Sequence, residues 1–476
     1  MNRIINLNTI ITSIVLLLLV SCGKSFTDLA PISNANTNNF YNSESDFESA
    51  ITAAMNTLYS VYAPEGPVSY TGELMGDNAT LYIIAGAQAD KHAFRDYTIQ
   101  TPNTMVYSFW RQFYSALFAV NTVLDKLQIA SQVDVEYKKV AEAEMRFLRG
   151  LYYFQMVRLW GGVPLVTKAV SAQESYSILR SSEAEVYNQI KSDLRYAADN
   201  LPLSSNVKLV GRPTKGAAQT VLGEVYLTLG DKANAAKELL EVYNSQEYAL
   251  QSTYAAVWGP NVKNTKESVF EIQYSSANAS TGTHSPFYQF FFPNVNVLGF
   301  SGVGMNQVTD DLYNEFETGD PRRDIAISLG YQNGATFQEQ KFYKKWIHPN
   351  ATINGTTLLA NNDFMVYRFA EVLLMLTEAT GDAQYLNKVR GRAGLPLWGT
   401  AGYPTSRYGT LELALEHEAR MELAGEYKRW FLLKRLNRAI PVLTAKGKQV
   451  TQDKLLLPVP DIVRLQNSAI TQNPGY

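Results

Sequence analysis

Histidine and cysteine are the residue types most able to do chemistry, and this chain of 476 residues has only four histidines and one cysteine. His417 and Glu418 begin like the zinc-protease motif H-E-x-x-H, but Met421 stands where the second histidine belongs. The chain contains neither a G-x-S-x-G nucleophile elbow nor a P-loop. Adjacent acids such as Asp310 and Asp311 are no indication of two carboxyls held across a cleft. The sequence therefore predicts a protein that is not an enzyme and needs no metal or cofactor.

The single cysteine, Cys22, directly follows an apolar run. Arg3 and the apolar residues 10–20 have the order and length of a secretory signal peptide, and the run is shorter than the roughly 20 residues that span a bilayer. The sequence Leu-Val-Ser-Cys at 19–22 resembles the lipobox of bacterial lipoproteins, in which the signal is cut before a cysteine that becomes acylated. We therefore predict that Cys22 is lipidated and holds the protein at a membrane surface. The alternative is an ordinary secreted protein with an incidental cysteine, since no second cysteine exists for a disulfide.

Two loop-like stretches concentrate aromatic side chains among glycine and polar residues, and these are the candidate binding segments. Aromatic faces suit the C–H surfaces of sugars, carboxylate and amide groups suit hydroxyls, and an aromatic cleft would equally accept an extended peptide. The alternative for each aromatic residue is packing beneath a long loop. In stretch 69–97 the candidates are Tyr70, Asp77, Asn78, Tyr82, His92, Phe94 and Tyr97, and in stretch 283–300 they are His284, Phe287 and Tyr288.

Composition restricts the classes of partner. The chain has 42 basic and 44 acidic side chains and a formal net charge of −2, so no basic surface for nucleic acid is predicted. Tyrosine outnumbers phenylalanine, 29 to 21, and tyrosine combines an apolar face with a polar tip that suits wet binding surfaces. These values fit a soluble globular body that is held at a surface by its first residue.

Helical periodicity predicts the elements that position these residues. Apolar stripes indicate long helices over about 104–128 and 136–159. Capping boxes at Ser45-x-x-Glu48 and Ser182-x-x-Glu185 indicate two further helix starts. Residues 63–101 break into Pro, Gly and isolated tyrosines, which predicts a long loop region.

Two segments share a helix–junction–helix design. Residues 221–243 carry Gly230-Asp231 at the junction, and residues 371–389 carry Gly381-Asp382. Leu-Gly-x-x-Tyr at 222–226 matches part of the tetratricopeptide repeat pattern, in which small residues let paired helices approach closely. We predict a mostly α fold: a tetratricopeptide-like scaffold of helical hairpins, interrupted by a loop-rich insertion that carries the ligand face.

Several arginines and tryptophans belong to the predicted helices and are interpreted as structural. A guanidinium between packed helices can bond carbonyls or carboxylates, and Glu422 is a plausible partner. The residues assigned to packing in this way are Arg149, Arg158, Arg420, Arg429, Trp110, Trp160 and Trp430.

An ordered set of segments resembles the SusD/RagB family of outer-membrane lipoproteins of Gram-negative bacteria. The set includes FLRGLYYFQMVRLWGGVPLV (147–166), TGDPRRD (318–324), LNKVRGRAGLP (386–396), EHEARMELAGEYKRWFLLKR (416–435) and the ending LLLPVPDIVRLQNSAITQNPGY (455–476). The resemblance implies a binding protein that takes up a nutrient oligomer, a glycan or a peptide. It further implies that the protein acts as a hinged lid over a partner TonB-dependent (SusC-like) outer-membrane barrel. Its ligand site would lie on the face away from the helical repeats.

The resulting domain organisation has five parts. We predict a signal peptide at 1–21, a lipidated tether at 22–42, a helical-repeat region at 43–244, an insertion at 245–363 and a C-terminal helical region at 364–476. The predicted location is the outer membrane, lipid-anchored and exposed at the cell surface. The alternative function is a helical-repeat surface protein for adhesion or assembly that has no nutrient ligand.

Overall fold

The computed structural model describes residues 40–82, 88–277 and 283–476. Helices account for 51% of it and the strands are few and short, which confirms the mostly α prediction. The predicted signal peptide, Cys22 and the tether up to residue 39 lie outside the described residues. Within the described ranges, no helix is both long enough and apolar enough to cross a membrane.

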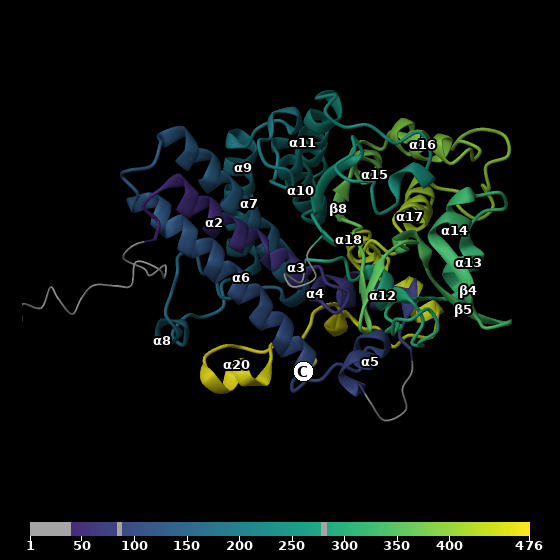
Figure 1. Ribbon diagram of the computed structural model, residues 1–476, viewed down its shortest axis with the longest axis horizontal. Coiled ribbons are helices and arrows are strands. Elements are labelled where there is room, and N and C mark those ends of the chain that lie inside the picture. The colour runs from purple at the N-terminus through teal and green to yellow at the C-terminus, as the bar shows by residue number, and fades with distance from the viewer. Residues whose placement is uncertain (1–39, 83–87, 278–282) are drawn as a thin grey trace, which may run out of the picture.

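The first half of the chain is a succession of helices (Figure 1). They are α2 (Glu44–Met55), α3 (Thr57–Val61), α4 (Pro67–Ser69), a π-helix (Tyr70–Leu74), α5 (Ala89–Asp96), α6 (Thr104–Ile129), α7 (Val135–Trp160), α8 (Ala172–Ser175), α9 (Glu183–Asn200), α10 (Lys215–Thr228) and α11 (Lys232–Asn244).

Helix starts follow the cap residues closely. The long helices α6 and α7 begin and end within about two residues of the predicted ranges. The capping box of Ser182 and Glu185 opens α9 as predicted. At α2 the predicted box was wrong: Ser43 and Asp46 form it. Two overlapping Ser-x-x-acid pairs fit the pattern there, and only the backbone conformation selects between them.

The two predicted hairpins are present, and they are confirmed as parts of a continuous helical array. Gly230 ends the α10 segment with φ +76°, and Asp231 caps α11 by accepting a hydrogen bond from the Asn234 backbone at 3.1 Å. Gly381, with φ +71°, and Asp382 do the same between α15 (Phe369–Thr380) and α16 (Ala383–Arg392). From α7 the array continues through α9, α10, α11 and α15 to α16, each helix packing on the next.

Residues 63–101 differ from the predicted loop. They contain α4, the π-helix and α5, and most residues from Gly66 to Ala79 are buried. A side chain at Gly72 would meet the carbonyl oxygen of Tyr427 at 2.0 Å, so the π-helix packs directly against another backbone. Helices this short show no periodic stripe, which is why the sequence pattern did not predict them.

The insertion carries short strands and helices between loops. Four small antiparallel pairings involve it: β4 with β5, β6 with β7, β1 (Ala79–Thr80) with β3, and β2 with β8 (Phe364–Arg368). Within residues 40–82, 88–277 and 283–476, 3-10 turns also occur at 204–206, 255–257, 344–346 and 452–455. The elements of the insertion are β2 (Ser268–Ile272), α12 (Phe287–Phe291), β3 (Gln307–Val308), α13 (Asp310–Glu315), α14 (Pro321–Ala326), β4 (Ile327–Asn333), β5 (Thr336–Tyr343), β6 (Thr352–Asn354) and β7 (Thr357–Leu359).

The C-terminal region begins with a strand rather than the expected helix. β8 (Phe364–Arg368) pairs antiparallel with β2, with Ile272 opposite Phe364, and α15 starts only at Phe369. A short, fully buried apolar run has no periodicity that separates strand from helix. The remaining helices are α17 (Leu411–Glu422), α18 (Arg429–Arg435), α19 (Ala439–Ala445) and α20 (Asp461–Gln466).

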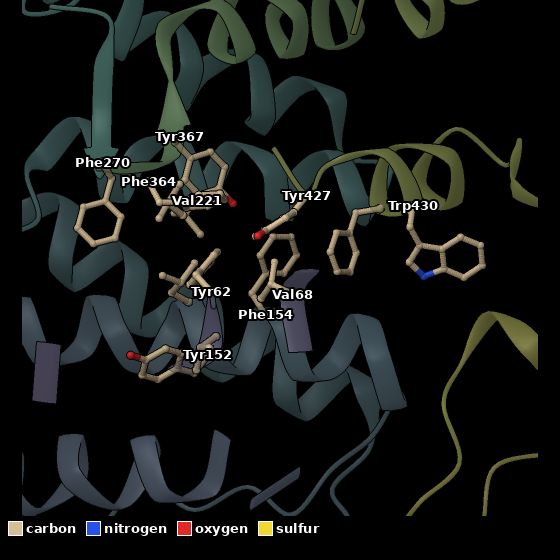
Figure 2. Close-up of a cluster of buried hydrophobic side chains, with 14 of the residues drawn as sticks. Tyr62, Val68, Tyr152, Phe154, Val221, Phe270, Phe364, Tyr367, Tyr427 and Trp430 are labelled. Atoms are coloured by element: carbon tan, nitrogen blue, oxygen red, sulfur yellow. The ribbon is translucent and has the colours of Figure 1, made fainter. Parts of the chain in front are cut away.

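One apolar core joins these parts (Figure 2). Phe364 of β8 lies among rings from three regions: Tyr62 after α3 (5.9 Å between ring centroids), Phe287 of α12 (5.0 Å) and Tyr427 before α18 (4.8 Å). The tryptophans assigned to packing, Trp110, Trp160 and Trp430, are all buried. N-terminal helices, insertion and C-terminal region therefore share a single interior.

The four arginines interpreted as structural are buried and paired. Arg149 binds Asp193 at 2.7 Å, and Arg158 binds Glu224 at 2.9 Å. Arg420 and Arg429 converge on Asp77. The proposed partner Glu422 was wrong for these four; it binds other buried arginines instead, namely Arg322, Arg368 and Arg392.

Candidate ligand-binding face

The fold brings the two aromatic stretches side by side. β1 pairs with β3 with Ala79 opposite Val308, and the Tyr82 backbone N–H donates to the Gly304 carbonyl at 3.0 Å. The Gly304 N–H in turn donates to the Phe292 carbonyl at 2.9 Å. Segments 69–82 and 287–308, more than 200 residues apart in sequence, therefore form one surface region.

Five of the predicted aromatic residues lie inside this region rather than on it. The rings of Tyr70 and Phe94 pack on each other with centroids 5.3 Å apart. Tyr97 donates a hydrogen bond from its hydroxyl to the Met75 carbonyl. Phe287 is fully buried, and Tyr288 packs on Phe300 in a small second apolar cluster. These side chains form the floor of the region, as the packing alternative predicted.

Asp77 and Asn78 are buried, and their side chains are bonded within the protein. The Asp77 carboxylate accepts hydrogen bonds from Arg429 at 2.6 Å and Lys446 at 2.7 Å, and Asn78 Oδ1 accepts one from Arg420 at 2.9 Å. Burial opposes ionisation of Asp77, but the three cations outweigh it and hold its pKa well below the ordinary value. Both side chains face the interior, where they tie α18 and α17 to the segment before β1.

The two candidate histidines are half-buried. Burial lowers the pKa of His92 and of His284 below the ordinary value, so both are neutral at pH 7. Within the described residues, neither ring nitrogen of His92 has a hydrogen-bond partner, and Nδ1 of His284 also has none. Each ring thus has unused hydrogen-bonding capacity.

Tyr82 is the one exposed member of the predicted set, with 40% of its surface accessible. It lies beside Asn294: a side chain at Gly304 would meet the Tyr82 Cβ at 2.7 Å and the Asn294 Cβ at 3.2 Å. Gly304 has φ +78° and no side chain, which allows this close approach. Asn294 is held by a hydrogen bond from its amide to the Val303 carbonyl at 3.1 Å.

A turn and a hairpin extend the surface beyond Tyr82. The bridge between Asn296 and Ser301 presents Leu298, which is 49% exposed, and a side chain at Gly299 would meet Ile353 Cδ1 at 3.1 Å. We call this surface the Tyr82 face and define it by Tyr82, Asn294, Asn296, Leu298 and Ile353.

Gln289 of α12 holds the parts of the Tyr82 face together. Its amide donates to the carbonyls of Ser301 and Thr356, both at 3.0 Å, and its side-chain oxygen accepts from the Leu358 N–H at 3.0 Å. One side chain thus fixes the turn against the β6–β7 hairpin. The face is preformed by these bonds, which lowers the cost of ordering it when a ligand binds.

Sequence reasoning missed four of the five side chains of this face. Asn294, Asn296 and Leu298 lie within the quoted stretch 283–300 but are not aromatic. Ile353 lies in a hairpin whose Asn-Gly turn at 354–355 is a recognisable sequence feature. Nothing in the sequence indicated that this hairpin would lie beside Tyr82.

The side chains of the Tyr82 face suit the binding of an uncharged polar ligand. It combines an aromatic ring and two aliphatic side chains with two amides, and none of the five side chains carries a charge. An aromatic ring can pack on the C–H face of a sugar, and amides can bond its hydroxyls. In the described part of the chain, no group of three or more His, Cys, Asp or Glu side chains could hold a metal ion.

The one motif that began like a metal site is part of the scaffold. His417 Nε2 lies 3.1 Å from Glu317 Oε1, and the His417 ring stacks on Tyr408 with centroids 3.8 Å apart. Glu416 pairs with Arg429, and Glu418 pairs with Arg322. These acids neutralise buried arginines, and neither belongs to the Tyr82 face.

Comparison with known proteins defines the class. A family model described as "Starch-binding associating with outer membrane" matches residues 26–227, and a model described as "SusD family" matches residues 328–476. SusD-like protein P2 of Formosa agariphila is 27% identical over 98% of this chain and 99% of its own. SusD-like protein P38 of the same organism is 26% identical over 98% and 99%.

Solved structures share the fold. A laminarin-binding SusD-like protein superposes with a TM-score of 0.79 and 28% identity, covering 92% of this chain and all of that one. Surface glycan-binding protein A from Bacteroides thetaiotaomicron, solved with laminarihexaose, gives 0.77 and 22% identity over 90% of this chain and 99% of that one. The fold is thus that of the SusD-like binding proteins. The chain belongs to the SusD/RagB family.

Proposed function

We propose that this protein captures a nutrient oligosaccharide on the Tyr82 face and delivers it, as a hinged lid, to a TonB-dependent outer-membrane barrel. The observation that carries the proposal is the pairing of β1 with β3, which presents exposed Tyr82 beside the amide of Asn294. An uncharged face of this kind matches a neutral glycan better than a charged ligand. The family resemblance supports delivery to the barrel.

The ten residues predicted from the sequence take two roles in this proposal. Tyr82 is the proposed contact because its side chain is exposed; His92 and His284 are half-buried and their unpaired ring nitrogens are themselves buried, so either ring would reach a ligand only after its side chain moves. The other seven members are buried, and in this proposal they act through packing rather than by contact with the ligand: Tyr70, Asp77, Asn78, Phe94, Tyr97, Phe287 and Tyr288.

Titration calorimetry with laminarihexaose and a panel of other oligosaccharides tests capture. Tyr82→Ala should weaken binding of the preferred glycan about tenfold, because it removes the aromatic surface. Tyr176→Ala is the matched control, since Tyr176 is 44% exposed and lies on a different surface. Equal losses from both variants, or none from Tyr82→Ala, would place the ligand elsewhere.

The alternatives make different predictions in the same experiment. Saturable binding of extended peptides, with no glycan bound, would identify a peptide importer. Absence of any small ligand, together with stable copurification of a partner that is not a barrel, would favour the adhesion or assembly function. Copurification of a TonB-dependent barrel with the tagged protein tests delivery directly.

Lipidation of Cys22 supplies the anchor in this proposal. Acyl chains on one residue hold a globular body at a membrane without spanning it. Cys22→Ser should release the protein from membranes and abolish acyl labelling. Unchanged membrane association of the variant would refute the anchor.

A further inference from the structure

A groove of about 530 Å³ lies on another surface, between α6, the segment 164–178 that contains α8, and the C-terminal α20. Aromatic side chains of α6 recur at helical spacing along its floor, at Tyr107, Trp110, Tyr114 and Phe118. Aliphatic side chains from the other two walls complete the lining. Figure 1 shows α8 and α20 beneath α6 on this side of the molecule.

The walls of the groove are fixed by hydrogen bonds. Tyr114 donates from its hydroxyl to the Pro164 carbonyl at 2.9 Å, and Asn121 donates from its amide to the Val166 carbonyl at 2.9 Å. At the other wall the Thr101 hydroxyl donates to Asp461 at 2.7 Å, at the start of α20. The groove is therefore preformed, and an occupant would pay little to order it.

The charges of the groove have one sign. Arg111 and Lys168 line it, and no lining residue is an acid. Arg111 is exposed and has no hydrogen bond or ion pair with any other described residue. The nearby carboxylate Glu174 accepts two hydrogen bonds from Ser171, from the backbone N–H at 2.7 Å and the hydroxyl at 2.8 Å. The charge of Glu174, in the α8 wall, also acts on Lys168, so Arg111 is the lining cation that has no acidic partner among the described residues.

The apolar surface extends beyond the groove itself. Phe118 is 55% exposed, Leu179 52% and Leu465 84%, so apolar side chains rise from all three walls toward solvent. Exposed apolar surface of this extent marks interaction sites. The lining is mostly aliphatic and aromatic, and its positive charge has no role in binding a neutral sugar, which distinguishes the groove from the uncharged Tyr82 face.

From this geometry we infer that the groove docks a segment of another polypeptide, apolar along one face and flanked by acidic residues. Its apolar side chains would fill the groove at helical spacing, as in helix-in-groove recognition. Its acids would pair with Arg111, which no described carboxylate neutralises. The inference is independent of glycan capture, because it uses none of the residues of the Tyr82 face.

Fluorescence anisotropy with two labelled amphipathic peptides provides the test. Both carry Leu and Phe at helical spacing, and they differ only in having Glu or Lys at the flanking positions. The Glu peptide should bind at least about tenfold more tightly, and Arg111→Glu should abolish or reverse the preference. Phe118→Ser should weaken both peptides, whereas Val210→Ser, at a 72% exposed position outside the groove, should change nothing.

Several results would overturn the inference. They are equal affinity for the two peptides, no saturable binding of the Glu peptide, or an unchanged preference in Arg111→Glu. Dodecanoate that binds more tightly than the peptide and displaces it would assign the groove to a lipid amphiphile instead. Tyr82→Ala should leave peptide binding intact and Arg111→Glu should leave glycan binding intact, so the two proposals fail separately.

Discussion

Glu73 is the fourth of the five residues of the π-helix, and its carboxyl is fully buried. It accepts hydrogen bonds from the Tyr343 hydroxyl and from the backbone N–H groups of Gly425 (3.2 Å) and Tyr427 (3.3 Å). Burial raises its pKa to about 7, and the hydrogen bonds and Lys345 oppose that rise without cancelling it. The folded protein therefore holds this proton at pH values where an unfolded chain has released it.

This proton makes stability depend on pH in a known direction. Between the ordinary pKa of 4.5 and about 7 the unfolded state ionises while the folded state does not, so the contribution of Glu73 to stability falls as pH rises. Glu73→Gln removes this dependence. Measured by urea unfolding, the stability of the variant relative to the native protein should rise by roughly 3 kcal/mol across that window.

Glu241→Gln is the control for this prediction, because Glu241 is exposed and makes no side-chain hydrogen bond within the described chain. Its stability relative to the native protein should not vary over the same pH range. A constant difference for Glu73→Gln at every pH would contradict the raised pKa.

Close approach of α10 and α11 depends on one glycine. A side chain at Gly223 would meet Leu239 Cγ at 2.6 Å, and Leu239 is fully buried. The tetratricopeptide-like pattern assigned such a role to a small residue here, and the structure supplies the contact. Glycine inside a helix is itself unfavourable, so its presence here reflects packing between helices rather than helix propensity.

Replacing glycine by alanine at two helix positions distinguishes the effect of packing between helices from that of helix propensity. Gly223→Ala should destabilise the protein by about 1–3 kcal/mol in urea unfolding, because the added methyl overpacks the helix pair. Gly391→Ala in α16 meets nothing closer than 3.7 Å and should be neutral or stabilising by up to about 1 kcal/mol. Similar effects of the two variants would show that α10 and α11 can move apart.

At the scale of the molecule, Phe364 connects three regions that are distant in sequence. Its ring stacks on Trp346 with centroids 5.5 Å apart and on Tyr427 at 4.8 Å, and it lies 5.9 Å from Tyr62 (Figure 2). The helical array, the insertion and the C-terminal region share this cluster. The domain boundaries at 244 and 363 remain a prediction, because one core passes through them.

Truncation of this ring should therefore destabilise every region together. We expect Phe364→Ala to cost about 3–5 kcal/mol, with far-ultraviolet circular dichroism and tryptophan fluorescence reporting the same shifted transition. Phe337→Ala, at a position 51% exposed, should change stability by less than about 0.5 kcal/mol. Separate transitions for the two signals would contradict a shared core.

Local patterns predicted the scaffold well for identifiable reasons. The stripes of α6 and α7, the box at Ser182 and the Gly-Asp junctions are set by contacts within a few residues. The predictions failed where local cues were duplicated or too short, as at Ser45 and in residues 63–101. Backbone conformation decided the first of these segments, and burial decided the second.

The binding face was only partly predictable. The two aromatic stretches lie side by side in the structure, which the sequence did not predict, and most of their rings pack inward because burying an aromatic side chain is more favourable than exposing it. Asp77 and Asn78 carry polar groups that suit a ligand. In the structure Arg420, Arg429 and Lys446, which are distant in sequence, bind Asp77, and Arg420 also bonds Asn78. Residue type alone does not distinguish these outcomes.

The sequence by itself determined the family, the helical hairpins and the absence of a catalytic motif, since each depends on residue order over short distances. Only the tertiary structure decided which of the aromatic residues face solvent. It did so by pairing β1 with β3, by placing Gly304 between Tyr82 and Asn294, and by folding the β6–β7 hairpin against Gly299. The first two contacts join segments more than 200 residues apart and the third joins segments about 50 residues apart, and their energy comes from burying surface that no local pattern records.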